Sequence, residues 1–203
     1  MELNQALHEI ADIRAQVART AVFRGYRSPT VAISAGIALV AGVLQWAFID
    51  DPLAMLDGYL KLWTAAAACS IGTTGVGMIA HLRRSRSALT LQHTRAAIER
   101  FIPCLAVGAA VTVAIAHRAP EAAWMLPGLW CLIFSLGIFA SGSLLPRAMA
   151  VVAAYYFMCG SFLLGCGVSA LAPWTMGLVF GVGQFSTAGI LYVTLERPDA
   201  HEG

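Results

Sequence analysis

The feature that most constrains this chain is a long stretch without charge, because no Asp, Glu, Lys or Arg lies between Ala148 and Leu195. One crossing of the hydrocarbon core of a bilayer needs roughly 20 apolar residues, so this stretch predicts two crossings. A soluble core able to bury it would be larger than 203 residues can build. Only 12% of the whole chain is charged, against about 25% in a typical soluble domain. The sequence therefore predicts an integral membrane protein.

Apolar segments separated by turns with Pro or charge predict an all-α fold, a polytopic bundle of six transmembrane helices over residues 29–196. Prolines recur in the outer turns, and a Trp recurs near the start of each returning helix, which indicates three helical hairpins. Chance resemblance between membrane hairpins is the alternative explanation for this repeat. The predicted spans cover about 30–49, 62–81, 101–117, 122–144, 148–168 and 174–195.

The placement of positive charge predicts the orientation in the membrane. With the N-terminus in the cytoplasm, the outer side receives only Lys61 and Arg118, and the other cationic residues lie inside. This bias is the positive-inside pattern, so we expect both termini in the cytoplasm. All five Trp fall near outer ends of spans, as a belt facing lipid or as an aromatic vestibule (Trp46, Trp63, Trp124, Trp130 and Trp174). The excess of Arg over Lys is typical of a GC-rich bacterial genome, which places the protein in a bacterial plasma (inner) membrane.

Residues 1–28 predict an amphipathic helix at the cytoplasmic face, and residues 197–203 a short cytoplasmic tail. The helix is too polar to cross the bilayer, and it lacks the apolar core of a signal peptide. Its apolar stripe is expected to contact lipid or a protein partner (Leu3, Leu7, Ile10, Ile13 and Val17).

A second cytoplasmic feature is the basic run that contains Arg83, Arg84 and Arg86. It fits attraction to anionic lipid head groups and a role in setting topology. No folded module for reading nucleic acid accompanies it, so we expect no nucleic-acid partner.

Gln184 lies near the middle of the last predicted span, where an unpaired amide in hydrocarbon is costly. It is expected to face the interior of the bundle, toward Thr73, Thr74, Ser135 or Tyr155. One interpretation is a structural hydrogen bond between helices. The other is a ligand contact in a cavity near the midplane of the membrane.

Small residues indicate where helices approach closely. Gly72, Gly75 and Gly77 lie in the second predicted span, and Gly177 and Gly181 form a G-x-x-x-G pattern that Gly183 extends. These glycines fit packing within the bundle or, alternatively, a homo-oligomer.

Catalytic, metal and cofactor sites are not predicted. The five Cys lie within apolar runs without C-x-x-C spacing and fit a role in packing (Cys69, Cys104, Cys131, Cys159 and Cys166). His81 and His117 lie at opposite ends of spans, which argues against haem. Asp50, Asp51 and Asp57 fit a solvated helix end better than a cation site.

Three function classes follow, and the first is a regulatory, sensory or accessory subunit that engages a partner through its N-terminal helix. The alternative is a small carrier or channel for a neutral or lipophilic solute, and a membrane enzyme comes last. A polar cavity around Gln184 would favour the carrier, whereas a solid bundle would favour the regulatory subunit.

Overall fold

The computed structural model describes residues 28–85, 88–142 and 144–196, and within these ranges every regular element is helical. Five helical segments are long and apolar enough to cross a membrane, and a sixth apolar helix is shorter. The chain is therefore all-α and compatible with an integral membrane protein. The predicted N-terminal helix and the tail at 197–203 lie outside the described residues.

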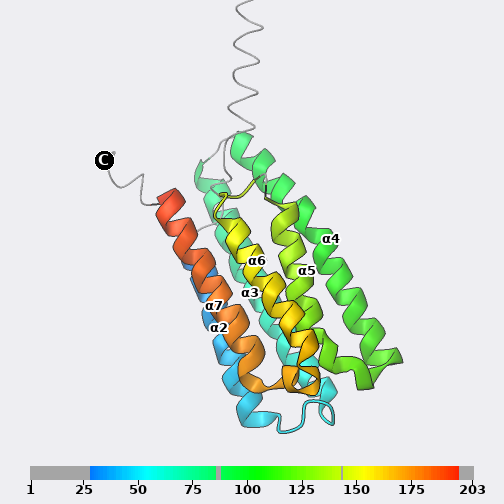
Figure 1. Cartoon of the computed structure of the whole chain (residues 1–203). Coiled ribbons are helices and arrows are strands. Elements are labelled where there is room, and N and C mark those ends of the chain that lie inside the picture. Colours follow the sequence, from blue (N-terminus) through cyan, green and yellow to red (C-terminus); the bar gives the residue numbers. More distant parts are fainter. Residues whose placement is uncertain (1–27, 86–87, 143, 197–203) are drawn as a thin grey trace, which may run out of the picture.

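The six α-helices of the described residues run side by side (Figure 1). Short helical turns, η1 and η2, follow α4 and α6 at the same end of the molecule as the connection between α2 and α3 (Figure 1). The helices are α2 (Ser28–Phe48), α3 (Leu56–Ser85), α4 (Ala88–Arg118), η1 (Pro120–Met125), α5 (Leu126–Ala140), α6 (Met149–Gly165), η2 (Gly167–Leu171), α7 (Pro173–Leu191) and the π-helical turn η3 (Tyr192–Glu196).

The helices differ from the predicted spans mainly in length. α4 begins 13 residues before the predicted span 101–117, on the side opposite η1, and α3 begins six residues before and ends four residues after the predicted span 62–81. Pro103, which the predicted span 101–117 places in its first turn, lies inside α4 instead. Proline lacks the N–H that a helix interior uses, but membrane helices tolerate it where neighbouring groups compensate. The basic segment before Pro103 therefore continues the helix.

Glycines bring two pairs of helices into close contact. Gly42 of α2 faces Gly177 of α7, where a side-chain carbon at Gly42 would lie 3.3 Å from the Gly177 Cα. Gly128 of α5 faces Gly160 of α6, where an added carbon would lie 2.9 Å from the Gly160 carbonyl oxygen. Backbones at this distance allow extensive dispersion contact, which drives helix association in lipid. The pairs α2/α7 and α5/α6 are accordingly the most extensive contacts.

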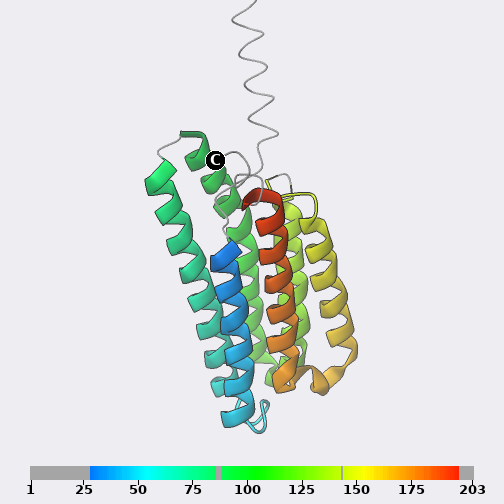
Figure 2. The ribbon, with the colours of Figure 1, turned by 90° about the vertical axis from the view of Figure 1, so that its left-hand side faces the viewer.

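This pairing differs from a row of three hairpins. α2 packs more extensively on α7, at the far end of the chain, than on its sequence neighbour α3. α6 packs mainly on α5 and only modestly on α7 (Figures 1 and 2). The glycine–glycine contacts, Gly42 with Gly177 and Gly128 with Gly160, join helices of different predicted hairpins, so the three-hairpin arrangement is not confirmed.

α3 and α4 lie at the edge of the bundle. α3 packs on α2, α4 packs on α5, and the two make few contacts with each other although they are consecutive in the chain. None of the described residues from Ile98 to Arg118 is buried, and only 11% of the α3 span is buried. Residues of both α3 and α4 line the candidate site described below.

Candidate functional site in the bundle

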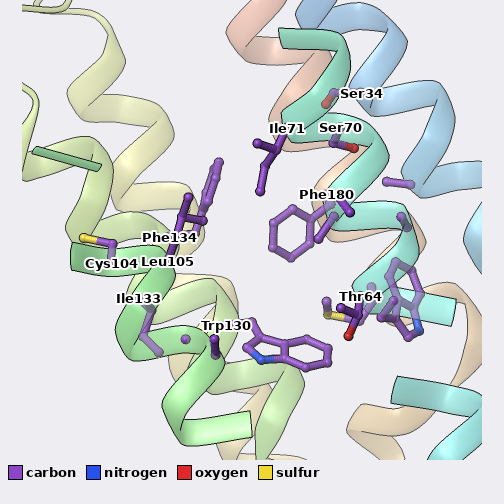
Figure 3. A pocket seen from close by; sticks show the side chains of 18 of the residues that line it. Ser34, Thr64, Ser70, Ile71, Cys104, Leu105, Trp130, Ile133, Phe134 and Phe180 are labelled. Carbon is purple, nitrogen blue, oxygen red and sulfur yellow. The ribbon is translucent and has the colours of Figure 1, made fainter. Parts of the chain in front are cut away.

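A cavity of about 400 Å³ lies between the helix pairs, which is within the ~300–1,000 Å³ typical of small-molecule sites. α3 forms one side, and α4 with α5 forms the other (Figure 3). α2 and α7 contribute the remaining wall. The residues that line the cavity include Ser34, Trp63, Thr64, Ala67, Ala68, Ser70, Phe101, Leu105, Gly108, Ala109, Thr112, Trp130, Phe134, Phe180 and Gln184.

Aromatic side chains form the back of the cavity. Phe134 makes edge-to-face contacts with Phe101 and Phe180, each with ring centroids 5.6 Å apart. Behind them, the buried ring of Tyr156 packs on both Phe134 and Phe180. Such aromatic contacts favour fixed geometry as well as apolar burial. This wall is therefore expected to keep its shape when the cavity is empty.

The cavity lining carries no Asp, Glu, Lys, Arg or His. A charged group brought to this depth would find no opposite charge, which is costly in a medium of low polarity. The lining thus selects for neutral occupants.

Several polar side chains in the lining lack partners. Within the described part of the chain, the side chains of Gln184, Ser34 and Ser70 make no hydrogen bond, and neither does that of Thr64. Ser34, Thr64 and Ser70 come from two different helices and border one space (Figure 3). Polar groups at membrane depth normally pair, so unpaired groups around one cavity mark a place where a ligand could pair with them.

Three of the four predicted partners of Gln184 make hydrogen bonds to other groups. The Ser135 hydroxyl donates to the Ala153 carbonyl oxygen at 2.7 Å, and the Tyr155 hydroxyl donates to Val179 at 3.0 Å. The Thr73 hydroxyl bonds back to Ser70 at 3.0 Å, and Thr74 is half-buried outside the cavity lining. Hydroxyl side chains on helices readily satisfy themselves on nearby carbonyls, so depth alone does not identify partners.

A second amide, Gln45, was not singled out from the sequence. Its side chain is fully buried, its Nε2 donates to the Leu171 carbonyl oxygen at 2.7 Å, and its Oε1 accepts from Trp63 Nε1 at 2.8 Å. Gln45 therefore ties α2 to η2 and α3, and it fixes an indole that lines the cavity. The sequence signal that could identify Gln45 is a glutamine within an apolar span, followed by a Trp at the start of the next span.

The tryptophans divide between the two roles considered. Trp46 and Trp174 point outward and remain 71% and 64% exposed, as a lipid-facing belt requires. Trp63 and Trp130 line the cavity, and Trp130 Nε1 donates to the Thr112 hydroxyl at 2.8 Å. Trp124, which belongs to η1, is half-buried against the core. Belt and aromatic vestibule thus coexist at one end of the bundle.

The glycines and two of the aspartates named from the sequence have structural contacts or face open space. Gly177, Gly181 and Gly183 face Gly42, Leu39 and Tyr156 of the same chain, which fits packing within the bundle. Gly72 and Gly75 face open space, and Gly77 faces Thr30. Asp51 caps a turn through Leu53 N and Ala54 N, and Asp57 pairs with Lys61 at 2.6 Å.

The predicted basic run and the predicted N-terminal stripe lie partly or wholly outside the described residues. Arg83 is exposed near the end of α3. The structure does not describe the side chain of Arg84, the residue Arg86 or the stripe from Leu3 to Val17.

Comparisons with protein-family models, with curated proteins and with solved structures found no match. The function of this protein is therefore inferred from the cavity and its lining residues.

Proposed function

We propose that this protein binds a neutral lipophilic molecule at membrane depth and acts as a carrier or receptor for it. The observation that carries the proposal is the cavity, because an uncharged, largely apolar lining there surrounds the unpaired polar side chains of Gln184, Ser34 and Ser70. Apolar walls with a few convergent polar groups are the usual composition of small-molecule sites. Of the two classes weighed from the sequence, this arrangement favours the carrier over the regulatory subunit.

The dimensions of the cavity argue against a channel. On α3 the lining runs from Trp63 to Ile71, which is about 12 Å along a helix. The hydrocarbon core is about 30 Å thick, so the cavity spans only part of it. A site of this kind holds a molecule within the membrane rather than conducting one through an open pore.

The proposed setting is a bacterial plasma membrane, with six spans and both termini in the cytoplasm. α6 has 17 residues, about 26 Å of helix, and η2 continues it toward the end where α2 meets α3. Asp51 and Glu121 would then face outward. Single cysteines at these positions should react with an impermeant thiol reagent in intact cells, after the native thiols are replaced. Reaction only after permeabilisation would reverse the orientation.

The test of function is to extract the purified protein with organic solvent and identify enriched molecules by mass spectrometry. Ala67 and Ala65 are both exposed on α3, but only Ala67 lines the cavity. Ala67→Phe fills the space, and Ala65→Phe adds the same bulk outside it. We expect a neutral lipophile to be enriched in wild type and Ala65→Phe and lost from Ala67→Phe. Equal extracts from all three would refute a cavity ligand.

The regulatory-subunit interpretation depends on the stripe within residues 1–28 and stays a prediction. Deleting residues 2–20 should leave lipophile retention unchanged if the cavity alone carries the function. Loss of a co-purifying protein on this deletion, with retention intact, would assign partner binding to the stripe as a separate property.

A further inference from the structure

Two helices that make few contacts with each other, α3 and α4, both line the cavity. Among their lining residues, Ala67, Ala68, Leu105 and Ala109 are exposed. These residues fall within spans long and apolar enough to cross a membrane. An opening between α3 and α4 at this depth would border lipid rather than water.

We infer that the cavity takes the ring-shaped head of a neutral amphiphile from the bilayer through this opening, while the apolar tail stays between α3 and α4 in lipid. The inference rests on the lipophile-binding function proposed above, and adds the class of ligand, its orientation and its route.

The aromatic residues indicate a ring. Trp130 lies at one end of the cavity, and Phe180 lies between the α3 side and the α4/α5 side (Figure 3). The indole of Trp63 also lines the cavity. Planar rings gain stacked or edge-on contacts with such side chains beyond the burial of their area. The hydrogen bonds from Trp63 to Gln45 and from Trp130 to Thr112 hold both indoles in place. The site is therefore organised for a flat group before it binds.

The unpaired polar side chains indicate a carbonyl or hydroxyl on that ring. The amide of Gln184 and the hydroxyls of Ser34 and Ser70 can both donate and accept hydrogen bonds. A bare hydrocarbon chain would leave all of them unpaired at membrane depth. A ring with oxygen substituents would pair with at least one of them while remaining uncharged.

The length of the cavity argues against a spanning helix as its occupant. On α3 the lining runs from Trp63 to Ile71, about 12 Å along the helix, whereas a helix that crosses the hydrocarbon core extends about 30 Å.

The probe for this inference is a benzoquinone that carries a decyl chain, with 1-decanol as the matched compound without a ring. The full chain is reconstituted in lipid nanodiscs, and compound retained per protein is measured over a concentration series with empty discs subtracted. We expect saturable retention of the quinone near one per chain. Decanol should show only linear partitioning.

Matched variants locate the route and the polar contact. Ala67→Phe and Ala109→Phe narrow the opening from opposite sides, whereas Ala65→Phe and Ala110→Phe add bulk at exposed positions outside the lining. The first two should weaken quinone binding at least tenfold, and the second two should leave it unchanged. Gln184→Leu should weaken it about tenfold, with no comparable effect on decanol partitioning.

The outcomes separate the two proposals. Linear quinone retention, saturable decanol retention, or equal effects of all four Phe variants would overturn the ring-head inference. If the quinone fails while solvent extraction still yields a lipophile lost from Ala67→Phe, the proposed function stands and the inference is wrong. If both experiments fail, the lipophile-binding function is wrong as well.

Discussion

Two glutamines at membrane depth have opposite surroundings. Gln45 is fully buried and uses both ends of its amide, one on Leu171 and the other on Trp63. Gln184 is only partly buried, borders the cavity and makes no hydrogen bond within the described residues. The same side chain therefore serves as a fixed link between helices at one place and as an unused polar group at another. Polarity at membrane depth does not by itself separate structure from function, and these two amides are distinguished by their hydrogen bonds together with their position at the cavity.

The two environments follow from how closely the helices approach. Gly42 against Gly177 and Gly128 against Gly160 remove the side chains that would separate α2 from α7 and α5 from α6. Those pairs become dense, and Gln45 and Ser135 within them make hydrogen bonds, whereas the buried hydroxyl of Tyr156 has no partner among the described residues. No comparable glycine contact joins α3 to α4 among the described residues. The space left there contains the cavity, and Gln184 borders it.

The largest expected effect comes from Gln45→Leu. The substitution leaves the buried Trp63 N–H and Leu171 carbonyl without partners, and each such loss costs about 1–3 kcal/mol. We expect the free energy of unfolding to fall by at least about 2 kcal/mol, measured by SDS titration in mixed micelles. An unchanged midpoint would mean that the Gln45 link contributes nothing to stability, and would remove the contrast with Gln184.

The composition and the long stretches without charged residues are sufficient to predict an all-helical chain with membrane-compatible spans, because the bilayer requires long uncharged segments. They were not sufficient to predict which helices associate. That depends on single contacts such as Gly42 with Gly177, far apart in the sequence. The depth of Gln184 in its span marks it in the sequence, but three of its predicted partners, Thr73, Ser135 and Tyr155, bond to carbonyls on their own or neighbouring helices. Gln45 was missed because its two partners come from separate segments.

A smaller effect is expected from Trp63→Phe, which removes one donor from Gln45 and keeps an aromatic ring in the cavity. The Gln45 Oε1 then lacks its partner, while the Nε2 bond to Leu171 remains. We expect a loss of about 1–2 kcal/mol in the same SDS titration. Trp130→Phe serves as the comparison, because its partner Thr112 is half-buried rather than fully buried. A greater loss in Trp130→Phe would show that the Gln45 link is not the stronger of the two.

Ser135→Ala tests a predicted partner of Gln184 that proved to be engaged elsewhere. The substitution removes the 2.7 Å bond to the Ala153 carbonyl between α5 and α6. Hydrogen bonds between membrane helices average only about 0.6 kcal/mol, so we expect a loss of that order. Quinone retention should not change, because Ser135 is outside the cavity lining. A clear drop in retention would instead place Ser135 among the residues that act on the ligand.

The smallest effect on stability is expected from Gln184→Leu. This variant tests most directly whether Gln184 and Gln45 have different roles. The amide has no partner to lose within the described residues, and its replacement removes the cost of keeping a polar group in hydrocarbon. We expect the free energy of unfolding to change by less than about 0.5 kcal/mol or to rise slightly. Quinone affinity should nevertheless fall about tenfold, whereas Ser186→Ala, exposed on the same helix outside the lining, should change neither quantity. If Gln184→Leu destabilised the protein as much as Gln45→Leu, both amides would be structural, and the unpaired polar groups would no longer indicate a ligand.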